Sequence, residues 1–195
     1  MGLLKELESH PLAGKITAVL DICTRLPLCL WYDAHPQTHD QSFWPLIRAV
    51  LKPGMLVIFD LGYTNFAVFQ QLTQQGVTFV TRAKTNLKAE VEQVLRRQAS
   101  VHDRVVWIGQ GATRQRVRLI EVLYKGTWYR YLTNEVDVER LPLEYVVALY
   151  WQRWRIEDAY NVVKPLLGLA YFWSGSQNAV ELQVWATWVL YSKWG

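Results

Sequence analysis

The sequence predicts an α/β fold in which helices flank a mixed β-sheet, and three patterns support this prediction. Residues 55–60 form a short continuous apolar run, which is typical of a central strand covered on both faces. A predicted helix at 65–75 and a strand at 77–82 follow, so a right-handed parallel crossover is expected. Residues 103–133 instead alternate between apolar and polar side chains around a Lys-Gly turn, which predicts antiparallel strands.

The segment before the apolar run predicts a hairpin and a helix. Residues 15–22 and 28–34 carry β-branched and apolar side chains on either side of a turn, so they are expected to pair as two strands. Asp40 can cap a helix over residues 41–51, which the Pro-Gly pair at 53–54 would end.

The second half of the chain predicts one β segment between helices. Residues 86–99 are expected to form a short charged helix, followed by an antiparallel β insertion at about 100–135. A long helix is predicted over 141–169, and a last amphipathic helix, rich in tryptophan, over 178–193. Because no internal repeat is present, residues 1–195 are expected to form a single domain.

The composition limits the class of protein. The chain of 195 residues is 51% hydrophobic, which is enough for a sizeable core and excludes a wholly disordered protein. A net charge of +4 and a pI near 9.1 permit a nucleic-acid partner without demonstrating one. Cys23 and Cys29 are expected to be buried thiols, and His35 and His39 to be surface residues of a loop and not metal ligands.

No targeting or membrane segment is apparent in the sequence. The first residues, MGLLKELESH, are charged and lack the long apolar core of a signal peptide. No apolar run approaches the length that crosses a bilayer. A soluble cytoplasmic protein with no membrane partner is therefore expected.

The segment from Tyr150 to Lys164 carries the most informative spacing. Arg153, Glu157 and Lys164 follow Tyr150 by 3, 7 and 14 residues, as Y-x2-R-x3-E-x6-K. On one continuous helix these four side chains fall within roughly a 60° arc. Pro165 is expected to kink or end the helix just after them. Beside this arc runs an apolar stripe that would face a core: Tyr145, Leu149, Ile156, Tyr160, Val163 and Leu167.

This pattern resembles the signature of DDE-type transposases of bacterial insertion sequences, in the IS-four family. The resemblance implies that Glu157 is the last of three acidic metal ligands. It also implies that Arg153 and Lys164 contact DNA phosphates and that Tyr150 helps to hold the strand. The same residue types are common on solvated helix faces, where Arg153 and Glu157 would form an ordinary pair one turn apart. The helix alone leaves both interpretations open.

Asp60 is the other acidic candidate. It ends the apolar run and precedes Leu-Gly-Tyr, and the resemblance implies that this position carries the second catalytic aspartate. Independently, ligands of open α/β sheets bind beyond the carboxyl ends of strands, where Gly62 would permit a close approach of the backbone. The alternative is that Asp60 only caps the following turn.

The resemblance implies a chemistry that depends on clustered carboxylates. Asp60 and Glu157 are the expected catalytic and metal-binding residues, with Mg²⁺ (or Mn²⁺) as the cofactor, because hard cations prefer oxygen ligands. Two such ions can activate a water or a 3′-hydroxyl and stabilise the leaving oxygen of an in-line displacement at phosphorus. Tyr150, Arg153 and Lys164 are the expected DNA- and phosphate-binding residues.

The first acidic ligand of the family has no expected counterpart in the sequence. The family places it on a strand before the hairpin, and Asp21, Asp33 and Asp40 match other positions. The order of elements resembles an RNase H-like mixed sheet whose first strand is missing. We therefore expect a transposase catalytic domain truncated at its N-terminus and defective in strand cleavage as this fragment.

Three functions are compatible with these residues. The first is a transposase domain that cleaves and joins transposon-end DNA during transposition, as a homodimer in a synaptic complex. The second is a non-catalytic remnant that binds DNA or a protein partner through Arg153, Lys164 and the tryptophan-rich end. The third is an RNase H-like nuclease without a role in transposition. Trp185, Trp188 and Trp194 could serve an interface, although core packing is the simpler interpretation.

Overall fold

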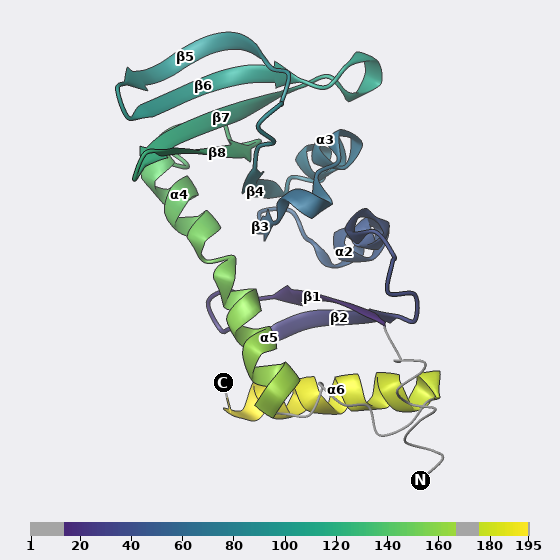
Figure 1. Ribbon diagram of the computed structural model, residues 1–195. Helices are drawn as coiled ribbons and strands as arrows, with labels where there is room; N and C mark the ends of the chain where they lie inside the picture. Colours follow the sequence, from purple (N-terminus) through teal and green to yellow (C-terminus); the bar gives the residue numbers. More distant parts are fainter. Residues whose placement is uncertain (1–13, 167–175, 195) are drawn as a thin grey trace. The chain divides into compact units, whose positions relative to one another are not determined.

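The computed structural model describes residues 14–166 and 176–194 (Figure 1). The elements follow in this order: β1 (Lys15–Leu20), β2 (Pro27–Asp33), the 3₁₀ helix η1 (Asp40–Phe43), α2 (Trp44–Val50), β3 (Leu56–Phe59), η2 (Leu61–Tyr63), α3 (Phe66–Gln74), β4 (Thr78–Arg82), β5 (Glu90–Gln98), β6 (Val101–Ile108), η3 (Gly111–Thr113), β7 (Gln115–Tyr124), β8 (Thr127–Thr133), α4 (Leu143–Trp151), α5 (Trp154–Leu166) and α6 (Gln177–Trp194).

The chain divides into two compact units, which are described separately. The sheet unit comprises Phe43–Arg153. The hairpin unit combines the segment up to Ser42 with the segment from Trp154 onward. In the described part of the chain, no helix has both the length and the apolar character needed to cross a membrane.

The sheet unit contains the mixed sheet that the sequence predicts. Its six strands lie in the order β3-β4-β8-β7-β6-β5. Strands β3 and β4 are parallel and joined through α3, which confirms the predicted crossover. All other neighbours in this sheet are antiparallel. The α/β class of the fold is thus confirmed.

Helices cover both faces of the sheet around β3 and β4. On one face, Phe69 of α3 packs against Phe79 of β4 with ring centroids 4.4 Å apart, and Trp44 of α2 meets Phe59 of β3 at 4.9 Å. On the other face, Val146 and other residues of α4 pack against β4, β7 and β8. Residues 55–60 were expected in a central strand, but β3 is an edge strand of the described sheet, in which Phe59 is buried and Leu56 is 36% exposed.

The prediction of a charged helix at 86–99 is wrong, because residues 90–98 form the edge strand β5. Strand β5 pairs with β6 in an antiparallel register that is interrupted by two irregularities. Ion pairs also tie it to Arg116 of β7, through Glu92 at 2.5 Å, and to Arg114 just before β7, through Glu90 at 2.7 Å. Backbone pairing and these cross-strand charges override the helix propensity of Glu, Gln and Arg. The antiparallel segment therefore begins before residue 100 and joins the parallel pair through β8.

The predicted continuous helix over 141–169 is also wrong. Helix α4 ends at Trp151, a turn follows at Gln152 and Arg153, and α5 begins at Trp154. The amide of Arg153 donates to the carbonyl of Tyr150 at 3.0 Å, a contact three residues back that tightens and ends α4. Residues 167–169 of the prediction lie outside the described chain.

The break separates the signature residues, and the burial along α4 also differs from the expected stripe. The signature residues cannot share one helical arc, because Tyr150 lies on α4, Arg153 in the turn, and Glu157 and Lys164 on α5. Tyr145, which was expected in the apolar stripe, is 63% exposed, whereas Tyr150 is 6% exposed and lies in the core of the sheet unit.

The hairpin unit has its own small core. Strands β1 and β2 form a separate antiparallel sheet of two strands, with Ala18 opposite Leu30. Its buried core draws on β2, α5 and α6: Leu30, Ala159, Val163, Val180, Val184, Trp188 and Tyr191. The hydroxyl of Tyr160 donates to the carbonyl of Ile16 at 3.2 Å, which ties α5 to β1.

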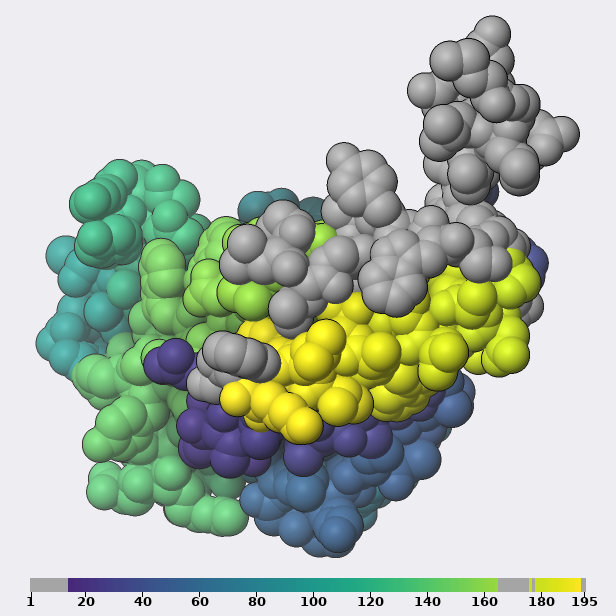
Figure 2. Space-filling model, turned by 90° about the horizontal axis from the view of Figure 1, so that it is seen from below, coloured from purple at the N-terminus to yellow at the C-terminus, as the bar shows by residue number. Residues whose placement is uncertain are grey.

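The tryptophans of α6 differ in burial. Trp188 lies in the core, as the simpler interpretation predicts, whereas Trp185 is half exposed with Leu182 and Val189. Figure 2 shows α6, in yellow, at the surface of the described chain. The side chain of Trp194 lies outside the description.

Loss of an aromatic ring from the sheet core should destabilise the sheet unit. Phe79 is fully buried against Phe69, so Phe79→Ala is expected to lower the free energy of unfolding by about 3–5 kcal/mol in urea denaturation. Tyr124→Ala, which removes an exposed ring from β7, serves as the control and should change it by no more than about 0.5 kcal/mol. Equal effects of the two substitutions would contradict the assigned core.

Candidate active site

Asp60 lies directly beyond the carboxyl end of β3. It begins η2, and its Oδ1 accepts a hydrogen bond from the amide of Leu61 at 2.7 Å. The side chain is 54% exposed, so its oxygens are open to solvent and to a ligand. Asp60 can therefore cap the turn and bind a ligand at once. Its Oδ1 accepts the hydrogen bond of the turn, and its Oδ2 takes no part in that hydrogen bond.

The hydroxyl of Tyr150 reaches Asp60 from the opposite element. Tyr150 sits near the end of α4, and its hydroxyl donates to Asp60 Oδ1 at 3.3 Å. Its ring packs on Tyr131 of β8, with centroids 5.3 Å apart. This aromatic contact and the burial of the ring fix the direction of the hydroxyl toward the strand end.

Burial also keeps the Tyr150 hydroxyl protonated. Its pKa is raised to about 12, chiefly because burial disfavours the tyrosinate and next because Asp60 places a negative charge beside it. The positive charges of Arg153 and Arg82 oppose this rise in pKa. At neutral pH Tyr150 is consequently a hydrogen-bond donor to Asp60.

Arg153 adds a positive charge to the same group. Its Nη1 lies 4.0 Å from Asp60 Oδ2, and its guanidinium carbon lies 5.8 Å from the centre of the Tyr150 ring. A pair of this length to an exposed carboxylate contributes little stability, about 0–1 kcal/mol at most. The Arg153 side chain is 14% exposed and lies in the turn after α4.

Arg82 is a site residue that the sequence argument missed. It ends β4, and the parallel register of Phe59 with Thr81 places it level with Asp60 on the neighbouring strand. Its guanidinium lies 5.9 Å from the ring centre of Tyr129, and its charge acts on Tyr150. The sequence did contain a signal for Arg82. The predicted strand at 77–82 ends in this residue, and the carboxyl ends of parallel strands meet at the sheet edge that also carries Asp60.

Glu157 and Lys164 belong to the hairpin unit. Both lie on α5, where Glu157 is partly buried in the first turn and Lys164 is exposed in the last. The ammonium of Lys164 lies 5.4 Å from the ring centre of Tyr160. Asp60, Tyr150 and Arg153 therefore form one group in the sheet unit, and Glu157 and Lys164 are carried by α5 of the other unit.

The group around Asp60 fits part of a divalent cation site. An exposed carboxylate at a strand end supplies the hard oxygen donor that Mg²⁺ and Mn²⁺ prefer. Over residues 14–166 and 176–194, no three His, Cys, Asp or Glu side chains gather closely enough to hold a metal ion. Asp60 can thus provide one ligand, and further acidic ligands must come from outside this group.

The comparison with protein families agrees with the type of fold. A model of the transposase DDE domain family matches residues 10–192, and the chain belongs to this family.

Two curated proteins align with most of the chain. The protein named "Putative transposase y4zB" from Sinorhizobium fredii (strain NBRC 101917 / NGR234) is 27% identical over 153 residues, which cover 73% of this chain and 42% of that protein. The "Probable transposase for insertion sequence element IS5377" from Geobacillus stearothermophilus is 23% identical over 152 residues, covering 75% of this chain and 40% of that protein. The aligned part thus spans about two fifths of each relative's length.

Removal of the Tyr150 hydroxyl should change how stability depends on alkaline pH. The ordinary tyrosine pKa is 10.0, and the folded chain raises the pKa of Tyr150 to about 12. The stability linked to this proton is therefore complete below about pH 10 and is lost as the pH rises to about 12. Urea unfolding across this window is expected to show the wild type losing stability relative to Tyr150→Phe.

Tyr145→Phe is the matched control, because it removes an exposed hydroxyl from the same helix. A stability difference between wild type and Tyr150→Phe that stays constant from about pH 9 to about pH 12 would show that Tyr150 titrates alike in the folded and unfolded chains.

Proposed function

We propose that this domain binds DNA at the carboxyl end of β3 and takes part in metal-dependent strand cleavage and strand transfer during transposition. The observation that carries the proposal is the convergence of the Tyr150 hydroxyl and the Arg153 guanidinium on Asp60. Two residues of the sequence signature, Tyr150 and Arg153, are thereby in contact with the acid at the end of β3. Membership of the transposase DDE domain family also supports a role in transposition.

Asp60 and Glu157 are the residues that we propose as ligands of Mg²⁺ or Mn²⁺. The bound cations would supply Lewis-acid activation of the attacking oxygen and stabilisation of the leaving oxygen. Asp60 contributes an exposed carboxylate whose orientation is held by Leu61 and Tyr150. Glu157 contributes a carboxylate from the first turn of α5. Both side chains are hard oxygen donors, which supports this assignment.

The cationic residues would hold the DNA backbone. Arg153 can present a planar fork to a phosphate, and Lys164 can act as a point charge. Arg82 lies level with Asp60 and would extend the positive edge along the sheet. Tyr150, protonated at neutral pH, keeps its hydroxyl on Asp60 and thereby orients the carboxylate. Assignment to the IS-four family, transposon-end DNA as substrate and a homodimeric synaptic complex belong to this proposal, and the Y-x2-R-x3-E-x6-K spacing supports them.

Binding to a short DNA duplex at several salt concentrations tests the role of Arg153. If Arg153 contacts a phosphate, Arg153→Ala should weaken binding for every sequence and reduce the slope of log affinity against log salt by about 1. Arg140→Ala removes an exposed arginine that pairs with Glu135 in the same unit, and it should leave the slope unchanged. Equal slopes for Arg153→Ala and wild type would remove Arg153 from the DNA interface.

Calorimetric titration with Mn²⁺ tests the metal role. Asp60→Asn and Glu157→Gln should each weaken Mn²⁺ binding by at least about tenfold, because each removes an anionic ligand. Asp158→Asn is the matched control, since Asp158 is an exposed acid next to Glu157 on α5. DNA binding without any metal dependence, and unchanged Mn²⁺ affinity in both variants, would instead identify a non-catalytic DNA-binding domain.

A further inference from the structure

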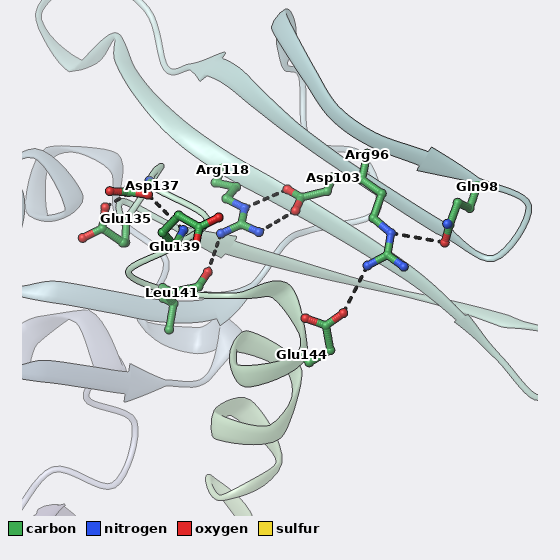
Figure 3. A network of polar contacts seen from close by, with 9 residues as sticks. All are labelled: Arg96, Gln98, Asp103, Arg118, Glu135, Asp137, Glu139, Leu141 and Glu144. Carbon is green, nitrogen blue, oxygen red and sulfur yellow. Dashed lines mark hydrogen bonds and ion pairs between the residues drawn. The ribbon is translucent and has the colours of Figure 1, made fainter.

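A buried ion pair lies where the antiparallel strands meet the start of α4 (Figure 3). Arg118 of β7 and Asp103 of β6 are 1% and 2% exposed. The guanidinium donates to both carboxylate oxygens, from Nε to Oδ1 at 2.8 Å and from Nη2 to Oδ2 at 2.5 Å. This two-point geometry satisfies both charges in a region that excludes water.

The same guanidinium has a third contact, and that contact leads to α4. Arg118 Nη1 donates to the carbonyl oxygen of Leu141 at 2.5 Å, two residues before the helix begins at Leu143. A second contact from the sheet meets the first turn of α4, where Arg96 Nη1 lies 3.1 Å from Glu144 Oε1. Figure 3 shows both contacts reaching the helix start, one from β7 and one from β5.

The loop that enters α4 is ordered by its own carboxylates. The amide of Asp137 donates to Glu135 at 3.1 Å, and the amide of Glu139 donates to Asp137 at 2.9 Å. The amide of Leu141 then donates to the carbonyl of Asp137 at 3.1 Å. The position of Leu141 is thus defined from both sides, by the loop and by Arg118.

We propose that the Asp103–Arg118 pair is a positioning device that fixes where α4 begins and thereby where Tyr150 meets Asp60. Tyr150 lies seven residues beyond Leu143, which is about 10 Å along a helix at 1.5 Å per residue. A helix of this length behaves as a rigid rod, so a shift at its start moves the Tyr150 hydroxyl by a similar amount. The contact to Asp60 is already 3.3 Å long and tolerates little movement.

A purely stabilising role does not require this pair. Apolar side chains of similar volume often stabilise a core as well as a buried ion pair does, or better. The apolar contacts of α4, such as Val146 on the sheet, are non-directional. The hydrogen bond from Arg118 to the Leu141 carbonyl is directional and fixes where the helix starts relative to β7.

This inference rests on the proposed function only through the role given to Tyr150. Its test reads the environment of the Tyr150 ring and not DNA cleavage or metal binding. Failure of the proposed function would therefore leave the positioning result intact, and failure of the positioning would leave the metal and salt measurements intact.

The test uses the full chain labelled with 3-fluorotyrosine and observed by ¹⁹F NMR at neutral pH. Tyr150→Phe assigns the Tyr150 resonance by its loss. The main variant is Asp103→Leu combined with Arg118→Met, which replaces the ion pair by apolar groups. Arg118→Lys keeps the charge opposite Asp103 and removes the fork. Arg116→Met is the matched control, since Arg116 lies on the same face of β7 in an exposed pair with Glu92.

The positioning role predicts that the double variant unfolds in urea at or above the wild-type midpoint while the Tyr150 resonance moves and its H₂O/D₂O isotope shift increases. Arg118→Lys should move the same resonance in the same direction, and Arg116→Met should leave it unmoved. An unchanged Tyr150 resonance in a folded double variant, or an equal movement with Arg116→Met, would overturn the inference. If the double variant does not fold, Arg118→Lys provides the test: movement of the Tyr150 resonance supports the inference, and an unchanged resonance overturns it.

Discussion

The candidate site depends on one structural constraint, the parallel pairing of β3 with β4. Parallel pairing brings the carboxyl ends of two strands to one edge, so Asp60 and Arg82 lie level there although 22 residues separate them in sequence. The coverage of both faces then places α4 against the sheet, and the end of this helix directs Tyr150 and Arg153 to Asp60. An antiparallel pairing of the same two strands would separate the two charges by the length of a strand.

Sequence patterns predicted the elements whose signals are local. The apolar run at 55–60, the following helix and the strand at 77–82 were found because an apolar run, a stop at Gly76 and a short crossover each leave a mark in the sequence. The central position expected for the first strand was wrong, because β3 lies at the edge of the described sheet. Strand β5 was missed because its charged residues favour a helix. Its pairing with β6 and its ion pair with Arg116 of β7 depend on residues that are distant in sequence. The break at Gln152 was missed because no Gly or Pro marks it.

The site was predictable to the extent that its residues end predicted elements. Asp60 could be found from its position after an apolar strand, and the signature residues from their spacing. The contacts of Tyr150 with Asp60 and of Arg118 with Leu141 could not be found, because they join residues 90 and 23 positions apart through tertiary packing. Burial of Tyr150 in place of Tyr145 likewise follows from the way α4 lies on the sheet.

We propose that Asp60 and Glu157 are both metal ligands, and iron-directed backbone cleavage tests this claim most directly. Fe²⁺ bound in place of Mg²⁺, with ascorbate and peroxide, generates radicals that cut the chain beside the metal ligands. The claim predicts two cuts, one near residue 60 and one near residue 157, and both should disappear in Asp60→Asn or with excess Mg²⁺. Cutting near only one of these positions, or an undiminished cut near residue 157 in Asp60→Asn, would contradict it.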